Sequence, residues 1–178
     1  MALVSYSTVG YWMPLFLAQQ HGWTTTEYGS FYIWWALFST PGFWLGGWMI
    51  DRLGRRLGFG ILLLEAAFFL TIWIFAQDKL VLWLLGMAWS FGFIGVWGPV
   101  TAEMYPNRTR GVGNGFSWSV AFFIGVVLWP FVSVWLRNVT GSFVAAFLLI
   151  PVLLMIMAAV IWFYSPENAR KDLNEIAV

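Results

Sequence analysis

The chain has 178 residues, of which 61% are hydrophobic, 21% aromatic and only 10% charged. Soluble domains carry about 25% charged residues, and a small domain leaves many residues at its surface, so this composition excludes a water-soluble fold. The net charge of +1 gives no basis for binding nucleic acid, and the absence of cysteine excludes disulfides and thiolate metal sites. At about 20 residues per span, the chain has room for six membrane-spanning helices.

Six apolar segments predict an all-α membrane protein with helices at about residues 2–20, 28–50, 57–76, 80–102, 112–136 and 142–164. The first segment is dotted with polar side chains and contains Pro14, which suggests a face turned toward a wet cavity. The second contains Gly42 and Gly46, a spacing that lets another helix approach closely. The sixth is almost entirely aliphatic and is expected to face lipid. Residues 165–178 are expected to form a polar cytoplasmic tail.

Glu65 is the one ionisable residue placed well inside an expected span. A lone carboxyl in hydrocarbon is costly, so it is expected to be protonated, paired or functional. Two interpretations stay open: a proton-coupling group, or a carboxyl that is buried against a neighbouring helix or reaches toward a charged loop. His21 is the only histidine, and a solvated loop position is favoured over a proton relay.

A short charged stretch separates the second and third apolar segments and has the pattern G-x-x-x-D-R-x-G-R-R. Its specified positions are Gly47, Asp51, Arg52, Gly54, Arg55 and Arg56. The stretch resembles the signature loop of the major facilitator superfamily of membrane transporters, which joins the second and third helices of a six-helix repeat on the cytoplasmic side. The alternative, a basic loop that only stops membrane insertion, leaves the two glycines and Asp51 unexplained.

Two further motifs support this resemblance. Glu103 and Arg110 have E-x6-R spacing, and Glu167 belongs to a tail similar to the P-E-T…L-x-E-I ending of sugar-porter-like members. The three motifs, in this order, resemble the C-terminal six-helix half of a twelve-helix transporter, in the sugar-porter-like or organic-acid-symporter-like branch. Two departures leave the substrate open, because no Q-Q-x-x-G-x-N pattern follows Gln19 and Gln20, and Ala121-Phe122 stands where organic-acid members often carry G-R.

The basic residues are divided unevenly between the two sides that six spans define. The loops after the second and fourth segments and the tail hold seven of them, and the opposite side holds Lys79 and Arg137. The positive-inside rule places the richer side, and with it both termini, in the cytoplasm. The chain is therefore expected to be a multi-pass protein of the plasma or inner membrane.

The charged residues of the cytoplasmic side predict a gate. Arginines form paired hydrogen bonds with carboxylates, and several such pairs could latch the helix ends in one state of a two-state equilibrium. The expected members are the residues of the signature loop and of the two further motifs: Gly47, Asp51, Arg52, Gly54, Arg55, Arg56, Glu103, Arg110 and Glu167. The resemblance also implies a central cavity lined by helices one, two, four and five. Its aromatic candidates are Tyr11, Tyr32, Trp35, Trp89, Trp97 and Trp118, for which plain packing is an equally good interpretation.

The function implied by the resemblance is secondary active transport of a small polar solute, such as a sugar or an organic acid, coupled to protons. Alternating access needs two bundles, so the expected partners besides solute and lipid are a separate N-terminal half or a second copy. The alternative is a non-transporting membrane protein that acts as a partner or scaffold. The sequence contains no evident nucleophile–base pair, metal cluster or phosphate loop, so an enzyme is not expected, and neither a cofactor nor a metal is predicted.

Overall fold

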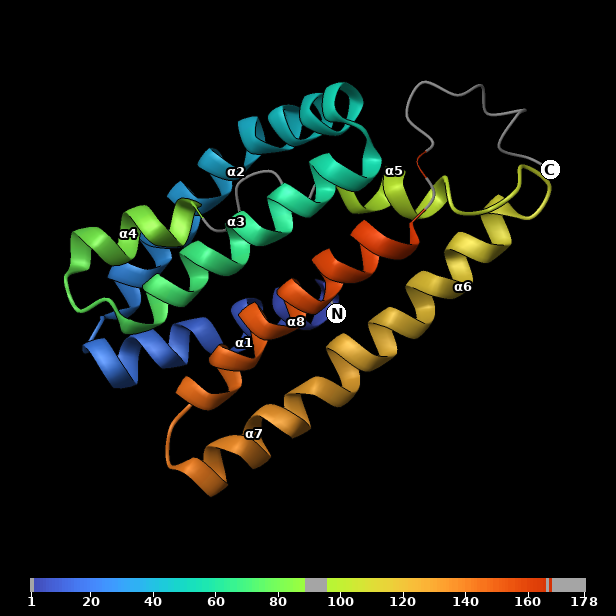
Figure 1. The fold of residues 1–178 in the computed structure, drawn as a ribbon. Coiled ribbons are helices and arrows are strands. Elements are labelled where there is room, and N and C mark those ends of the chain that lie inside the picture. Colours follow the sequence, from blue (N-terminus) through green and yellow to red (C-terminus); the bar gives the residue numbers. More distant parts are fainter. Residues whose placement is uncertain (1, 89–95, 166, 168–178) are drawn as a thin grey trace.

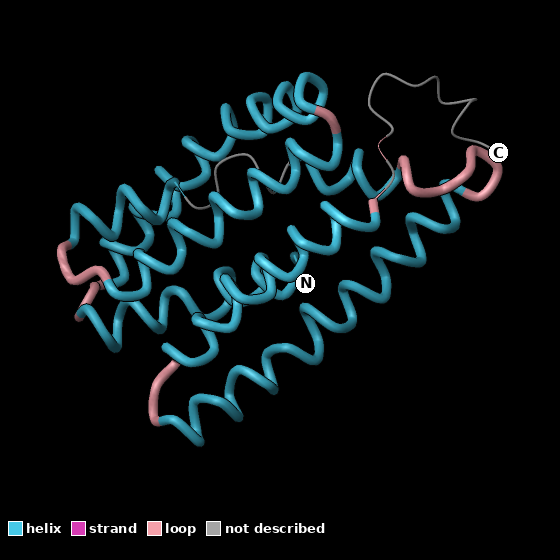
Figure 2. Tube along the Cα trace, viewed as in Figure 1, coloured by secondary structure: helices cyan, strands magenta, loops and turns pink. Residues whose placement is uncertain are grey.

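The computed structural model describes residues 2–88, 96–165 and 167 of the chain, and these residues form helices and no strand (Figures 1 and 2). The prediction of an all-α fold is therefore confirmed. In chain order the helices are α1 (Ala2–His21), α2 (Thr25–Leu53), α3 (Arg55–Phe75), α4 (Lys79–Ala88), α5 (Trp97–Ala102), α6 (Arg110–Phe122), the π-helical turn η2 (Phe123–Leu128), α7 (Trp129–Thr140) and α8 (Val144–Tyr164).

Three segments of the described chain are long and apolar enough to cross a membrane: Arg55–Phe75, Arg110–Thr140 and Val144–Tyr164. The second of these combines α6, η2 and α7, which follow one another without a break. Helices α1 and α2 have the length of a span, but their many polar and aromatic residues lower their hydropathy. All six predicted ranges overlap described helices, and the fourth overlaps both α4 and α5. Six membrane crossings remain a prediction.

The turn between α2 and α3 is only one residue long. Gly54 has a φ of +95°, a backbone conformation that a residue with a Cβ atom rarely adopts. Farther along, Gly58 faces the backbone of α2, where an added Cβ would lie 2.8 Å from the Cα atom of Ile50. Glycine at both positions lets α3 fold back closely against α2.

Helices α3 and α8 pack against each other along the middle of the bundle (Figure 1). Leu63, Leu70 and Trp73 of α3 are fully buried, as are Phe147 and Leu154 of α8. Lipid is as apolar as these side chains, so close packing holds the helices together rather than removal from water. The sixth predicted segment, which was expected to face lipid, corresponds to α8. One side of this helix is buried and the other is exposed.

The polar face expected on the first segment packs against another helix. The Ser7 hydroxyl donates to the carbonyl oxygen of Gly125 in η2, and the indole N–H of Trp129 donates to the Thr8 hydroxyl. A π-helical turn disturbs the regular backbone ladder, and Ser7 supplies a donor at that point. His21 is the last residue of α1, and its ring centroid lies 5.5 Å from that of Phe16, so it is less solvated than expected.

Candidate functional site

Arg55, the first residue of α3, joins two carboxylates at the end of the bundle where α2 turns into α3. Its Nε and Nη2 atoms donate to the two carboxylate oxygens of Glu103, each over 2.8 Å. Its Nη1 atom donates to Asp51, one turn earlier on α2. The side chains of Arg55 and Glu103 are 15% and 16% exposed, and that of Asp51 is 68% exposed. Two parallel bonds from one guanidinium fix the geometry as well as adding energy.

Glu167 meets the same turn from the other end of the chain. Its carboxylate oxygens accept the backbone N–H groups of Arg55, over 2.8 Å, and of Arg56, over 3.1 Å. These N–H groups belong to the first turn of α3, where the helix itself provides no acceptor and where negative charge is favoured. An added Cβ at Gly54 would lie 2.7 Å from Glu167 Oε2, so this glycine also makes room for the carboxylate.

We call Asp51, Arg55, Glu103 and Glu167 the Arg55 cluster. It ties together the end of α2, the start of α3, the segment after α5 and the segment after α8. Arg56 adds a bond from its guanidinium to the backbone carbonyl of Trp162 in α8. Four parts of the chain are therefore held at one end of the bundle by charged hydrogen bonds.

The two other arginines of the predicted gate have contacts of a different kind. The Arg52 guanidinium carbon sits 5.9 Å from the ring centroid of Trp48, and Arg110 donates from Nε to the backbone carbonyl of Tyr105 over 3.3 Å. A Cβ added to Gly47 would meet no described atom within 4 Å, so no close helix approach is seen there. Gly58, which the signature motif did not single out, has the close contact instead, and its G-x-x-x-G spacing from Gly54 is the sequence signal that could have indicated it.

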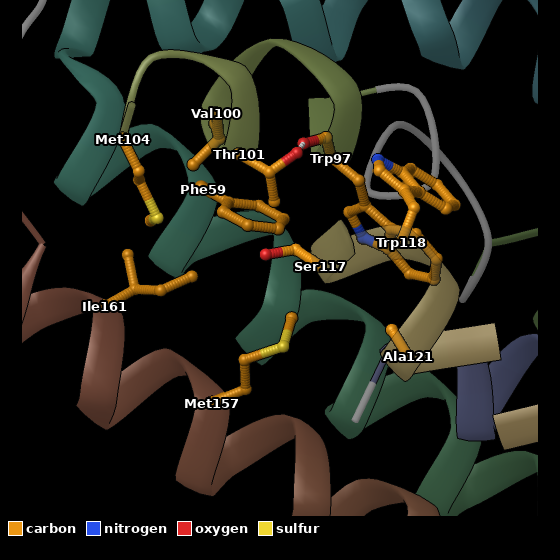
Figure 3. Close-up of a pocket in the computed structure, with 10 residues that line it drawn as sticks. All are labelled: Phe59, Trp97, Val100, Thr101, Met104, Ser117, Trp118, Ala121, Met157 and Ile161. Carbon is orange, nitrogen blue, oxygen red and sulfur yellow. Dashed lines mark hydrogen bonds between the residues drawn. The ribbon is translucent and has the colours of Figure 1, made fainter. Parts of the chain in front are cut away.

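A cavity of about 290 Å³ lies near the Arg55 cluster, between α3, α5, α6 and α8 (Figure 3). Its lining residues are Phe59, Trp97, Val100, Thr101, Met104, Ser117, Trp118, Ala121, Met157 and Ile161. None of them is charged. The two hydroxyls are already engaged, Thr101 with the carbonyl oxygen of Trp97 and Ser117 with the Tyr105 hydroxyl. This Trp97 cavity is therefore suited to an apolar or aromatic body.

The predicted cavity aromatics fall into different places. Trp97 and Trp118 line the Trp97 cavity together, with ring centroids 6.4 Å apart. Tyr32 and Trp35 form an edge-to-face pair on α2 at 5.8 Å, away from that cavity, and Tyr11 is 56% exposed. The remaining candidate, Trp89, lies outside the described residues.

Glu65 belongs neither to the Arg55 cluster nor to the Trp97 cavity. It lines a separate cavity between α2, α3 and α4, and it does not reach the charged end of the bundle. Within the described residues, no group of three or more His, Asp or Glu side chains is placed to hold a metal ion.

Comparison with known proteins gives a family for the chain. A profile described as the Major Facilitator Superfamily matches residues 1–177. The niacin transporter NiaP of Acinetobacter baylyi is 26% identical over 179 residues, which cover 98% of this chain and 40% of that protein. A Haemophilus influenzae protein provisionally named a metabolite transport protein is 28% identical over 185 residues, covering 97% of this chain and 44% of that protein.

The chain thus spans less than half the length of these two relatives. No solved structure matches it. The transporter names of the relatives and the family profile point to a membrane-embedded transporter rather than an enzyme. Because the profile extends over nearly every residue, the chain belongs to the Major Facilitator Superfamily.

Proposed function

We propose that this chain is the C-terminal six-helix half of a secondary active transporter that works by alternating access. Both termini lie on the cytoplasmic side of the cell membrane in this proposal, which the uneven division of basic residues supports. A second bundle, either a separate N-terminal half or another copy of the chain, completes the central site. The Arg55 cluster is the observation that carries the proposal.

The cluster acts as a latch at the cytoplasmic end. A fully exposed ion pair contributes about 0–1 kcal/mol, but hydrogen bonds to charged groups contribute about 1.5–3 kcal/mol when they are partly buried. Arg55 and Glu103 are at most 16% exposed, so their paired bonds belong nearer the second range. Two transporter states differ by only a few kcal/mol, and opening of this end by separation of the ends of α2, α3 and α5 within the bundle breaks these bonds. The latch therefore favours the state that is closed toward the cytoplasm.

The solute is a small polar molecule such as a sugar or an organic acid, and its movement is coupled to protons. The niacin transporter among the relatives favours the organic-acid class. Trp97 and Trp118 offer ring faces for a flat solute in the Trp97 cavity. None of the described residues that line that cavity is charged, so the second bundle would supply the group that binds a carboxylate. Glu65 is the candidate for proton coupling within this half.

A cysteine reporter tests the latch. The chain has no native cysteine, so Ser117→Cys places a single thiol in the wall of the Trp97 cavity. Its labelling by a membrane-impermeant maleimide added to the cytoplasmic side measures how often that end opens. Adding Arg55→Ala should raise the labelling rate about tenfold, as expected for a loss of about 1.4 kcal/mol.

Lys79→Ala is the matched control, since it also removes one basic member of an ion pair but at the opposite end of α2. Its labelling rate should equal that of the parent. Equal rates in all three proteins would overturn the latch.

A second measurement, the mass of the chain in nanodiscs, tests which second bundle completes the transporter. A dimer justifies uptake assays with niacin and a hexose under a pH gradient, and a monomer directs the search to the missing half.

A further inference from the structure

The cavity around Glu65 combines an apolar wall with a single charged side chain. It has a volume of about 380 Å³ and is lined by Phe38, Glu65, Phe69, Leu84, Met87 and Ala88. Two of these residues are aromatic and three are aliphatic or sulfur-containing. A mostly apolar cavity with one well-placed polar group is the usual form of a small-molecule site.

Glu65 stands ten residues after the start of α3, which is about 15 Å along the helix and close to the middle of a span. Its Oε2 atom is buried and accepts no hydrogen bond from the described residues. A buried acceptor without a donor is costly, and more so in hydrocarbon than at a surface. The described residues of the cavity therefore include no donor that satisfies this oxygen.

Basic residues of the described chain do not supply that donor. Ion pairs between described residues join Arg55 to Asp51 and Glu103, and Lys79 to Glu27, at the two ends of the bundle. None of them includes Glu65. A neutral lipid chain could fill the volume, but it would leave the Glu65 Oε2 atom without a hydrogen-bond donor.

An amphipathic ammonium has the missing chemistry. Its N–H groups would donate to Glu65 through charge-assisted hydrogen bonds, and its apolar body would contact the walls of the cavity. The rings of Phe38 and Phe69 add the attraction between a cation and an aromatic face. Phe38 and Leu84 are 48% and 59% exposed, so the cavity opens sideways between α2 and α4, where a membrane-soluble amine can enter.

We propose that the cavity between α2, α3 and α4 binds a lipophilic primary ammonium of single positive charge, with Glu65 as its counter-ion. This site is separate from the Arg55 cluster and from the Trp97 cavity. The inference requires neither the latch nor solute transport, and it is tested by binding alone.

The test compares 4-phenylbutylammonium with its neutral analogue 4-phenylbutanol, by calorimetry on the chain in nanodiscs of zwitterionic lipid. The ammonium should bind saturably and more tightly than the alcohol. Glu65→Gln should weaken binding of the ammonium about tenfold or more, since it removes the negative charge and leaves only a weaker hydrogen bond to a neutral amide oxygen. The same substitution should leave binding of the alcohol unchanged.

Two further variants locate the site. Leu84→Trp fills the cavity from its exposed rim and should weaken both probes, and it answers the question even where Glu65→Gln fails to fold. Glu27→Gln removes an acidic residue in the first turn of α2 and should leave both affinities unchanged. Equal affinity for the two probes, or ammonium binding that neither Glu65→Gln nor Leu84→Trp weakens, would overturn the proposal.

Discussion

The ion pairs at the two ends of α2 have similar distances between their charged atoms, but they differ in burial and in the number of segments that they join. At one end Arg55 meets Glu103 over 2.8 Å, and at the other Lys79 meets Glu27 over 2.6 Å. The first pair is 15% and 16% exposed, whereas Lys79 and Glu27 are 59% and 38% exposed. The Arg55 cluster also joins four parts of the chain, while the Lys79 pair joins only the starts of α4 and α2. Burial and the number of connected segments, rather than distance, should decide how much each end contributes.

Replacing Arg55 is the strongest test of whether the Arg55 end of α2 contributes more to stability than the Lys79 end. Arg55→Ala leaves Glu103 partly buried without its partner, and we expect the free energy of unfolding to fall by about 3 kcal/mol. Arg55→Lys should restore only part of the loss, because an ammonium cannot form two parallel bonds with one carboxylate. Tryptophan fluorescence during denaturation in detergent measures both. A loss no larger than that of Lys79→Ala would contradict the ranking of the two ends.

Gly58 tests whether the cluster depends on the close crossing of α2 and α3. Gly58→Ala introduces a Cβ 2.8 Å from the backbone of Ile50, so we expect about 1–3 kcal/mol of destabilisation and a loosened Arg55 cluster. Gly47→Ala is the control, because its Cβ would meet open space and alanine favours a helix by about 1 kcal/mol over glycine. Thermal unfolding of the two variants should shift in opposite directions, and equal shifts would exclude the steric explanation.

A change at Glu167 tests how much its carboxylate stabilises the start of α3 within the Arg55 cluster. Glu167→Gln removes the negative charge that accepts the N–H groups of Arg55 and Arg56, at an expected cost of about 1 kcal/mol. Hydrogen–deuterium exchange of these two amides should become faster, while the amides in the middle of α3 serve as the internal control. Unchanged exchange at the start of α3 would show that Glu167 is not its cap.

The smallest effect is expected at the exposed end. The hydrogen bond from Lys79, with those from the Thr24 backbone and side chain, lowers the pKa of Glu27 from 4.5 to about 2. Since the pKa is depressed in the folded state, the contribution of this pair to stability is complete above pH 4.5 and is lost as the pH falls toward 2. Lys79→Ala should move the titration of the Glu27 carboxyl, followed by carbon NMR, back toward 4.5, with little change in stability at neutral pH. An unmoved titration would show that Lys79 is not the main cause.

The composition and the local motifs were sufficient for the class of protein. A chain with 61% hydrophobic and 10% charged residues can only be stable in lipid, where backbone groups must be satisfied within helices. The signature stretch from Gly47 to Arg56 pointed to the family that the profile then showed. The lone carboxyl of Glu65 was also visible in the sequence, because one charge within a long apolar run needs no tertiary information to be noticed.

Only the tertiary structure decided which of these residues meet. Arg52, Arg55 and Arg56 carry the same charge within five positions, and their sequence does not reveal that Arg55 forms paired hydrogen bonds with Glu103, 48 residues away. Glu167 caps α3 from 112 residues away, and the cavity around Glu65 exists only where three helices converge. Whether the chain resides in lipid or in water, and where it forms helices, depend on local composition, which can be read directly from the sequence. Contacts between distant segments depend on which helices cross, and residue spacing along one helix can mark a close-packing face but does not identify the partner helix.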